Sequence, residues 1–179
     1  MTYTKDYDKI FCMMAKKYGL KKLLLKALAI RESSLNSEAY RFEPAFWDRY
    51  LVHNEEWKDE DPKIVSASWG LCQIMYVVAV ENGFKKGRPP EDLCDPVVNI
   101  QLAAKILKRL MNKVIEKRYC DDFWWYSPIQ IALARYNGGP GAGPDMGGVI
   151  REHPAEYALG VMEIWERLMK QEKECDDET

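Results

Sequence analysis

Apolar residues recur along most of this chain with the period of an α-helix, and this feature restricts the fold more than any other. In each stretch they stand three and four positions apart, so that they share one helical face. The stretches that read as helices cover residues 20–30, 100–115, 128–135 and 154–169. Asp95 and Pro96 precede the second of them as an N-cap and a first helical residue. We therefore expect a mostly α fold.

Two segments interrupt this pattern. Residues 36–66 are polar and aromatic with an acidic tip, and we expect an insert packed on the domain, with room for a short strand within 41–66. Residues 138–148 hold six glycines in eleven positions, which predicts a loop with positive φ angles. The glycines lack the motif contexts of phosphate-binding loops, so we expect no nucleotide there.

The length of 179 residues and mass of 20.8 kDa predict a single domain. We place that domain at residues 1–170 and expect the acidic tail, 171–179, to be disordered. The net charge of −2 argues against a nucleic-acid partner, since proteins that wrap duplexes need a large positive excess. We expect a monomer.

Cysteine and histidine usage gives no sign of a metal site. The five cysteines form no CxxC pair and the chain has two histidines, so we expect no metal and no other cofactor. The N-terminal residues lack the apolar stretch of a secretory signal. The longest apolar runs, 22–30 and 74–80, are too short to cross a bilayer. We expect synthesis in the cytoplasm and no membrane insertion.

Four short strings carry the functional prediction. In chain order they are Ile-Arg-Glu-Ser-Ser at 30–34, Ser-Trp-Gly-Leu-Cys-Gln-Ile-Met at 68–75, Asn-Ile at 99–100 and Ala-Arg-Tyr-Asn-Gly-Gly-Pro-Gly at 134–141. Tyr157 and Val161 follow them. Together these strings resemble the lysozyme-like lytic transglycosylases of the soluble (SLT) type, glycoside hydrolase family 23, over residues 20–168. The resemblance implies a lysozyme-like single domain that cuts peptidoglycan glycan strands.

Glu32 is the predicted catalytic residue. It ends an apolar helix, where the helix dipole opposes ionisation of a carboxylate. Burial against the same apolar face raises the pKa of a carboxyl group, so that the acid stays protonated near neutral pH. Such an acid is needed to protonate the leaving oxygen of a glycosidic bond.

The resemblance also assigns substrate-binding roles around Glu32. It implies that the hydroxyl of Tyr136 bonds the catalytic carboxylate, that Asn137 lines the sugar cleft and that Tyr157 brings a second hydroxyl. Asn99 is expected to organise structure. These residues all lie in or after the matching strings.

Three further residues complete the predicted site. Gln73 would offer its amide to a sugar hydroxyl or N-acetyl group, and Gly70 would permit close approach of the backbone. Ser33 is expected to orient Glu32 or to contact the polymer.

The chain departs from the family pattern at several positions. Cys72 stands where Met is usual, and Arg135 replaces Ala, where it would face a peptide carboxylate or solvent. Glu32 and Gly70 lie 38 positions apart, which marks an insert like that of some phage and prophage members. Glu43 and Asp48 of this insert are the candidates for a second carboxylate, and Glu43 is the one we expect at the substrate.

The number of carboxylates decides the predicted reaction. With Glu32 alone, the C6 hydroxyl of muramic acid closes a 1,6-anhydro ring without water. A second carboxylate about 6.5–9.5 Å away would activate water and give an inverting muramidase. We favour the transglycosylase, with the muramidase as the alternative and a non-catalytic glycan-binding protein as a further one.

Aromatic residues are expected mainly in the core, with Trp69 the best candidate for the cleft and residues 123–126, Trp47 and Trp57 as others. We expect the enzyme to reach the bacterial wall, in the periplasm or outside the cell, by a route other than a signal peptide.

Overall fold

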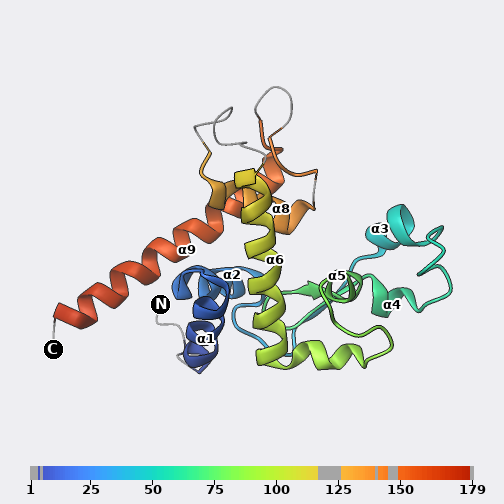
Figure 1. The fold of residues 1–179 in the computed structure, drawn as a ribbon, viewed down its shortest axis with the longest axis horizontal. Helices are drawn as coiled ribbons and strands as arrows, with labels where there is room; N and C mark the ends of the chain where they lie inside the picture. The colour runs from blue at the N-terminus through green and yellow to red at the C-terminus, as the bar shows by residue number, and fades with distance from the viewer. Residues whose placement is uncertain (1–3, 5, 117–125, 140, 145–148, 178–179) are drawn as a thin grey trace.

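The computed structural model describes residues 4, 6–116, 126–139, 141–144 and 149–177. The fold is mostly α, as predicted (Figure 1). Five helices form what we term the helical lobe: α1 (Asp8–Tyr18), α2 (Lys22–Ser33), α6 (Pro96–Glu116), α8 (Pro128–Gly138) and α9 (Glu152–Asp177). In this lobe α9 packs on α2 and α8, while α6 packs on α8 and α1.

Helix α2 lies at the centre of the lobe, since α1, α6 and α9 all contact it. Every residue from Leu24 to Ile30 is buried, which is expected of a helix surrounded by protein rather than one lying on a surface. Ser34, in the left-handed region with φ of 55°, ends the helix. The apolar run therefore fixes the position of Glu32, one residue before the helix ends.

The helices predicted from periodicity are confirmed, with longer bounds at several ends. Asp95 caps α6 as expected, because its side chain accepts the backbone N–H groups of Val97 (2.8 Å) and Val98 (2.9 Å). A capping box between Ser127 and Gln130 starts α8.

Two helical features lie outside the predicted bounds. Helix α1 was not predicted, although Phe11, Met14 and Ala15 are buried with helical spacing and Gly19 ends the helix at φ of 63°. Helix α9 continues to Asp177, through most of the segment for which a disordered tail is expected. The division of the chain at residue 170 stays a prediction. None of the helices in the described ranges is long and apolar enough to cross a membrane.

A small antiparallel sheet lies beside the helical lobe. It joins β1 (Tyr40–Phe42), β2 (Ala67–Trp69) and β3 (Ile74–Met75), in that order. Phe42 pairs with Ala67, so the chain leaves the sheet and returns to it at adjacent positions. The short strand for which the 41–66 stretch left room is therefore β1.

We term residues 36–66 the insert from here on, and its status as an addition to the family pattern stays a prediction. It contains β1, α3 (Pro44–Phe46), the π-helix η1 (Trp47–Leu51) and α4 (Pro62–Val65). After the insert come α5 (Tyr76–Glu81) and the 3-10 helix η2 (Pro90–Cys94). In Figure 1, α3 and α4 lie on one side of α6, and the C-terminal end of α9 lies on the other.

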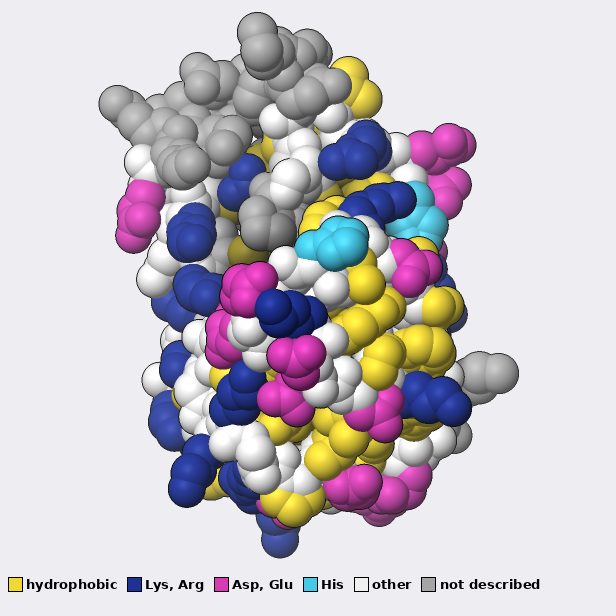
Figure 2. Space-filling model, turned by 90° about the vertical axis from the view of Figure 1, so that its right-hand side faces the viewer, with side chains coloured by type: hydrophobic (Ala, Val, Ile, Leu, Met, Phe, Trp, Pro, Cys, Tyr) yellow, Lys and Arg dark blue, Asp and Glu magenta, His cyan; other side chains and the backbone are white. Residues whose placement is uncertain are grey.

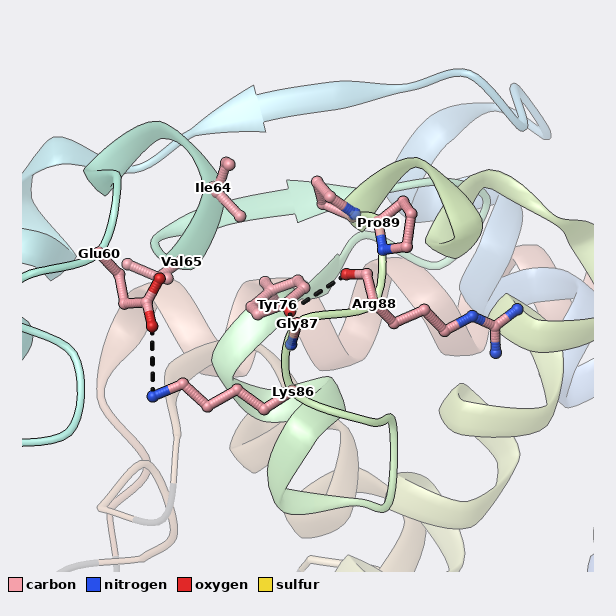
Figure 3. Close-up of a pocket in the computed structure, with 9 residues that line it drawn as sticks. Glu60, Ile64, Val65, Tyr76, Lys86, Gly87, Arg88 and Pro89 are labelled. Carbon is pink, nitrogen blue, oxygen red and sulfur yellow. Dashed lines mark hydrogen bonds and ion pairs between the residues drawn. The ribbon is translucent and has the colours of Figure 1, made fainter.

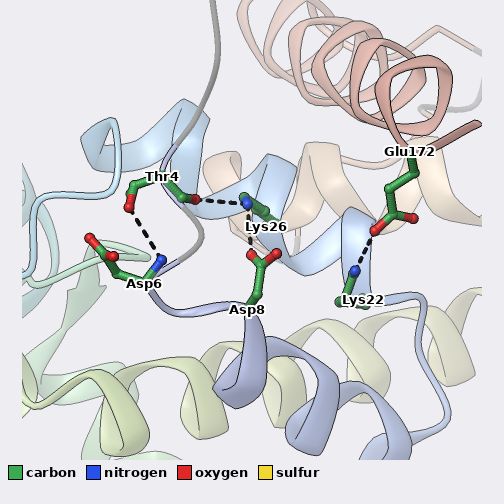
Figure 4. Close-up of polar contacts among 6 residues, drawn as sticks. All are labelled: Thr4, Asp6, Asp8, Lys22, Lys26 and Glu172. Atoms are coloured by element: carbon green, nitrogen blue, oxygen red, sulfur yellow. Dashed lines mark hydrogen bonds and ion pairs between the residues drawn. The ribbon is translucent and has the colours of Figure 1, made fainter. Parts of the chain in front are cut away.

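Two ion pairs hold α2 to other parts of the helical lobe (Figure 4). The buried Lys26 Nζ lies 2.6 Å from Asp8 Oδ1 and also donates to the backbone oxygen of Thr4. The more exposed Lys22 pairs with Glu172 of α9. The buried pair is the one expected to affect the free energy of unfolding, because exposed pairs contribute little to it.

Candidate active site

One large cleft collects most of the predicted site residues. Its volume is about 1110 Å³, and it is lined by the end of α2, the insert, the β2–β3 hairpin, α5, the end of α8 and the start of α9. The predicted residues that line it are Glu32, Glu43, Gln73, Tyr136, Asn137 and Tyr157. Ser33 and Gly70 do not.

The carboxyl group of Glu32 lies at the point where the helical lobe opens onto the cleft. Its side chain is half-buried, and loss of water on burial raises its pKa from 4.5 to about 7. The hydrogen bond from Tyr157 and the charges of Arg41 and Arg31 lower the pKa by smaller amounts, while the charge of Glu43 raises it. Near neutral pH, a large fraction of Glu32 is therefore protonated and able to donate.

The tyrosine that binds the carboxyl group of Glu32 is not the expected one. The hydroxyl of Tyr157, on α9, donates a hydrogen bond to Glu32 Oε1. The hydroxyl of Tyr136, on α8, donates instead to the backbone oxygen of Cys72 at 2.9 Å. The prediction that Tyr136 bonds the carboxylate is thus wrong in this structure. Burial raises the pKa of both tyrosines well above 10, so both remain donors.

The insert brings a second carboxylate to the cleft. Glu43 follows β1, lines the cleft and forms an ion pair with Arg41 on the same strand. The side chain of Glu43 is 33% exposed. Asp48, the other candidate, is exposed and does not line the cleft. Of the two carboxylates considered, only Glu43 therefore shares the cleft with Glu32.

Gln73 holds the wall of the cleft in shape. Its Nε2 donates to the backbone oxygens of Ala39 (3.1 Å) and Gly70 (3.0 Å), which join the start of β1 to the hairpin turn. Its φ of 47° is left-handed, as are those of Ser34 (55°) and Leu35 (67°). These are the non-glycine positions with positive φ in the described ranges. Gln73 itself lines the cleft, while Ser34 and Leu35 come two and three positions after Glu32. Such backbone is costly, and it gathers at functional sites.

The protein interior itself requires a glycine at position 70. Its φ is +71°, and a Cβ there would lie 2.5 Å from the backbone oxygen of Leu93 and 2.6 Å from Asn99 Nδ2. Asn99, fully buried on α6, accepts from the backbone N–H of Cys72 (2.7 Å) and donates to the oxygens of Trp69 (2.8 Å) and Leu93 (2.7 Å). The expected structural role of Asn99 is confirmed, while Gly70 serves the packing of the hairpin.

Ser33 also has a structural contact in place of the predicted one. Its hydroxyl donates to the backbone oxygen of Leu71 at 2.8 Å and accepts the N–H of Asn36 at 3.1 Å. It therefore ties the end of α2 to the hairpin, and it holds Glu32 in place only through the backbone.

Two departures from the family pattern prove to be interior residues. Cys72 is buried, and burial raises the pKa of its thiol, so it is unsuited to be a nucleophile. Arg135 is also buried, and the backbone of Gly143 lies directly against its guanidinium group. Arg135 therefore does not reach into solvent as one of the expectations had it.

The aromatic residues of the cleft differ from those expected. Trp69 is buried, packs edge-on against Tyr40 and does not line the cleft. Trp57 does line it, and Phe46 and Tyr50 of the insert line it as well. The latter two were missed, although their spacing of four places them on one helical face. Trp47 packs half-buried against the core, and residues 123–125 lie outside the described residues.

A smaller cavity of about 400 Å³ lies beside α4 and α5 (Figure 3). Lys86 Nζ stands 3.4 Å from Glu60 Oε1 on one side of it. On the other side, the hydroxyl of Tyr76 accepts the N–H of Gly87 (3.0 Å) and donates to the oxygen of Arg88 (3.2 Å). These contacts tie the insert and α5 to the loop before η2. Since no predicted site residue lines this cavity, the large cleft is the candidate active site.

Within the described part of the chain, no group of three His, Cys, Asp or Glu side chains is placed to hold a metal ion.

Comparison with protein families gives a match over most of the chain. The model of the family described as Transglycosylase SLT domain matches residues 9–148, which is more than half of the chain. The matched range includes α2 with Glu32, the insert, the hairpin and α8. No curated protein matches the chain.

Proposed function

Because the chain belongs to the transglycosylase SLT domain family, which acts on peptidoglycan glycan strands, we propose that it cleaves the β-1,4 bond between N-acetylmuramic acid and N-acetylglucosamine. The mostly α, lysozyme-like fold agrees with that family. The observation that carries the proposal is a carboxyl group, Glu32, with a pKa of about 7 in a cleft of about 1110 Å³.

Glu32 acts first as an acid. Its protonated carboxyl group donates to the glycosidic oxygen, which leaves as the C4 hydroxyl of N-acetylglucosamine. The muramic acid C1 becomes an oxocarbenium-like centre, or is held by its own N-acetyl oxygen. The negative charge now on Glu32 is stabilised by the hydroxyl of Tyr157, which donates to the carboxylate.

Glu32 then acts as a base. Its carboxylate takes the proton of the C6 hydroxyl of muramic acid while that oxygen attacks C1, and a 1,6-anhydro ring closes. The proton gained restores the starting acid, and no water is consumed. A pKa near 7 suits both steps, because general acid–base groups work best near the operating pH.

One observation favours a second candidate, a muramidase. Glu43 lines the same cleft, and its charge raises the pKa of Glu32, so the two carboxyl groups influence each other. In this candidate Glu43 would remove a proton from water as it attacks C1 on the face opposite Glu32. The ion pair with Arg41 holds the carboxylate of Glu43 at the wall of the cleft.

The test is mass analysis of the products formed from purified peptidoglycan by the native chain, Glu32→Gln and Glu43→Gln. We expect anhydro-muropeptides from the native chain and from Glu43→Gln. The rate should fall about 10²–10⁴-fold in Glu32→Gln. Products one water heavier that require Glu43 would establish the muramidase. No product from the native chain, with glycan binding retained, would indicate a glycan-binding protein instead.

A further inference from the structure

One face of the insert is turned toward the cleft and leaves aromatic residues uncovered. From Glu43 onward, the residues that line the cleft recur at intervals of one, three and four positions, as on one helical face. After Glu43 they are Phe46, Tyr50, Leu51, Asn54 and Trp57. Figure 2 views the molecule from the side of the insert, and hydrophobic side chains gather there in a broad patch bordered by charged ones.

This face has buried residues on its inner side and exposed ones on its outer side. Leu51 and Trp57 are buried, and the ammonium group of Lys86 lies 4.2 Å from the centroid of a Trp57 ring. Tyr50, by contrast, is 56% exposed, and Phe46 is half-buried. The buried residues anchor the insert, so the two outer rings are displayed on a supported surface.

The two outer rings are held at a defined angle. The centroids of Phe46 and Tyr50 lie 5.0 Å apart with their planes tilted by 52°. The guanidinium carbon of Arg49 lies 5.9 Å from the centroid of the Tyr50 ring. Ordering an aromatic side chain costs little entropy because it has two rotatable bonds, so this pair is prepared for a ligand.

The chemistry around the rings suits a carbohydrate. An aromatic ring presents an apolar face and, in Tyr, a polar edge. Asn54 and Glu81 line the same cleft and offer amide and carboxylate groups to hydroxyls. A pyranose ring needs this combination, since it has an apolar C–H face and a rim of hydroxyl groups.

The cleft is continuous from Glu32 to these rings, and its volume of about 1110 Å³ exceeds the roughly 300–1,000 Å³ of pockets for single small ligands. We propose that Phe46 and Tyr50 form an aromatic subsite that stacks on a sugar ring of the glycan strand, away from the bond that is cut. This inference rests on the proposed function, because it takes a glycan as the ligand.

The experiment measures the dissociation constants of N-acetylglucosamine oligomers, from dimer to hexamer, with the Glu32→Gln chain, in which cutting should be about 10²–10⁴-fold slower. Adding Tyr50→Ala should weaken hexamer binding about three- to tenfold, as expected for one lost ring contact. Dimer binding should change little, and Tyr50→Phe should retain hexamer binding. Tyr40→Ala is the matched control, since Tyr40 is 47% exposed but does not line the cleft.

The outcomes separate the subsite from the proposed function. An unchanged hexamer affinity in Tyr50→Ala would overturn the subsite even if the native chain forms anhydro products. A change in oligomeric state in that variant, without a change in hexamer affinity, would make the face an interface between copies and also overturn it. Failure of the native chain to form products would contradict the proposed function, whereas the length-dependent loss of affinity would still support the subsite.

Discussion

The helical lobe and the insert contribute to the same cleft in opposite ways. In the helical lobe, Glu32 ends a helix whose preceding turns are buried, and its surroundings exclude water from the carboxyl group. In the insert, most side chains from residue 43 to 61 are exposed or half-buried, and Leu51 and Trp57 are the buried ones. The lobe therefore sets acid strength, while the insert presents charges and rings to the ligand.

Catalysis and the choice of ligand are therefore assigned to different regions of the molecule. A pKa near 7 needs burial, which only a packed lobe supplies, and it comes at a cost in stability. Ligand contact needs exposed groups on a supported segment, and loops often serve this purpose. The β2–β3 hairpin joins the two regions, because β2 pairs with β1 of the insert while Asn99 of α6 binds the hairpin backbone.

The largest effect is expected where the two regions are joined. Asn99→Ala leaves the N–H of Cys72 and the oxygens of Trp69 and Leu93 without their buried partner. We expect the free energy of unfolding to fall by about 3 kcal/mol in chemical denaturation. The exposed Asn54, which accepts one local N–H, is the matched control, and Asn54→Ala should change stability by less than about 0.5 kcal/mol. Equal losses in both variants would contradict a special role for Asn99.

The next effect is the loss of stability that comes from burying the carboxyl group of Glu32 in the helical lobe. Its pKa is about 7 in the folded chain and 4.5 for the ordinary group, so between these values the folded state binds more protons than the unfolded state. The contribution of Glu32 to the free energy of unfolding is thus fully present below pH 4.5 and is lost as the pH rises through 7. Relative to Glu32→Gln, the native chain should lose about 2 kcal/mol between pH 4.5 and 8, after allowing for partial exposure.

Thermal and chemical unfolding of both chains across this pH range measure that difference. A flat difference between the native chain and Glu32→Gln would show that burial does not tune Glu32.

The smallest effects are expected from the groups in each region that shift the pKa of Glu32. Both the hydroxyl of Tyr157 and the charge of Arg41 favour the ionised form, with Tyr157 the stronger. In Tyr157→Phe, the alkaline limb of the activity profile should therefore move to higher pH, with a fall in kcat of less than about tenfold. Arg41→Gln should move it less, in the same direction. Tyr136→Phe should leave it in place, because that hydroxyl binds Cys72; a shift there equal to that of Tyr157→Phe would reverse the assignment.

The helices could be predicted because each has an apolar face with a regular period, and that period does not depend on distant contacts. Of the strands, only room for a short one within 41–66 was foreseen, since β1, β2 and β3 have two or three residues each and are held by pairing across the sheet. Helix α1 was missed despite the spacing of Phe11, Met14 and Ala15, so in that case the signal was present.

At the site, the raised pKa of Glu32 could be anticipated because the family resemblance, together with its place at the end of an apolar helix, favoured a buried carboxyl group. Which tyrosine reaches it could not, because α8 and α9 both approach α2 and only their packing decides between Tyr136 and Tyr157. Trp69 was misplaced for the same reason: its motif borders the cleft, but its side chain lies in the core.

The pairing of Phe42 with Ala67 has a consequence for how such a chain can change. The backbone N–H of Glu43 also donates to the oxygen of Ser66 (2.9 Å), so residues 44–65 start and finish at neighbouring points. Lengthening a closed loop costs only about 0.6 kcal/mol for each doubling. A segment of another length or sequence can therefore replace residues 44–65. Such a replacement can change which polymer the cleft binds, while Glu32 keeps its position on α2.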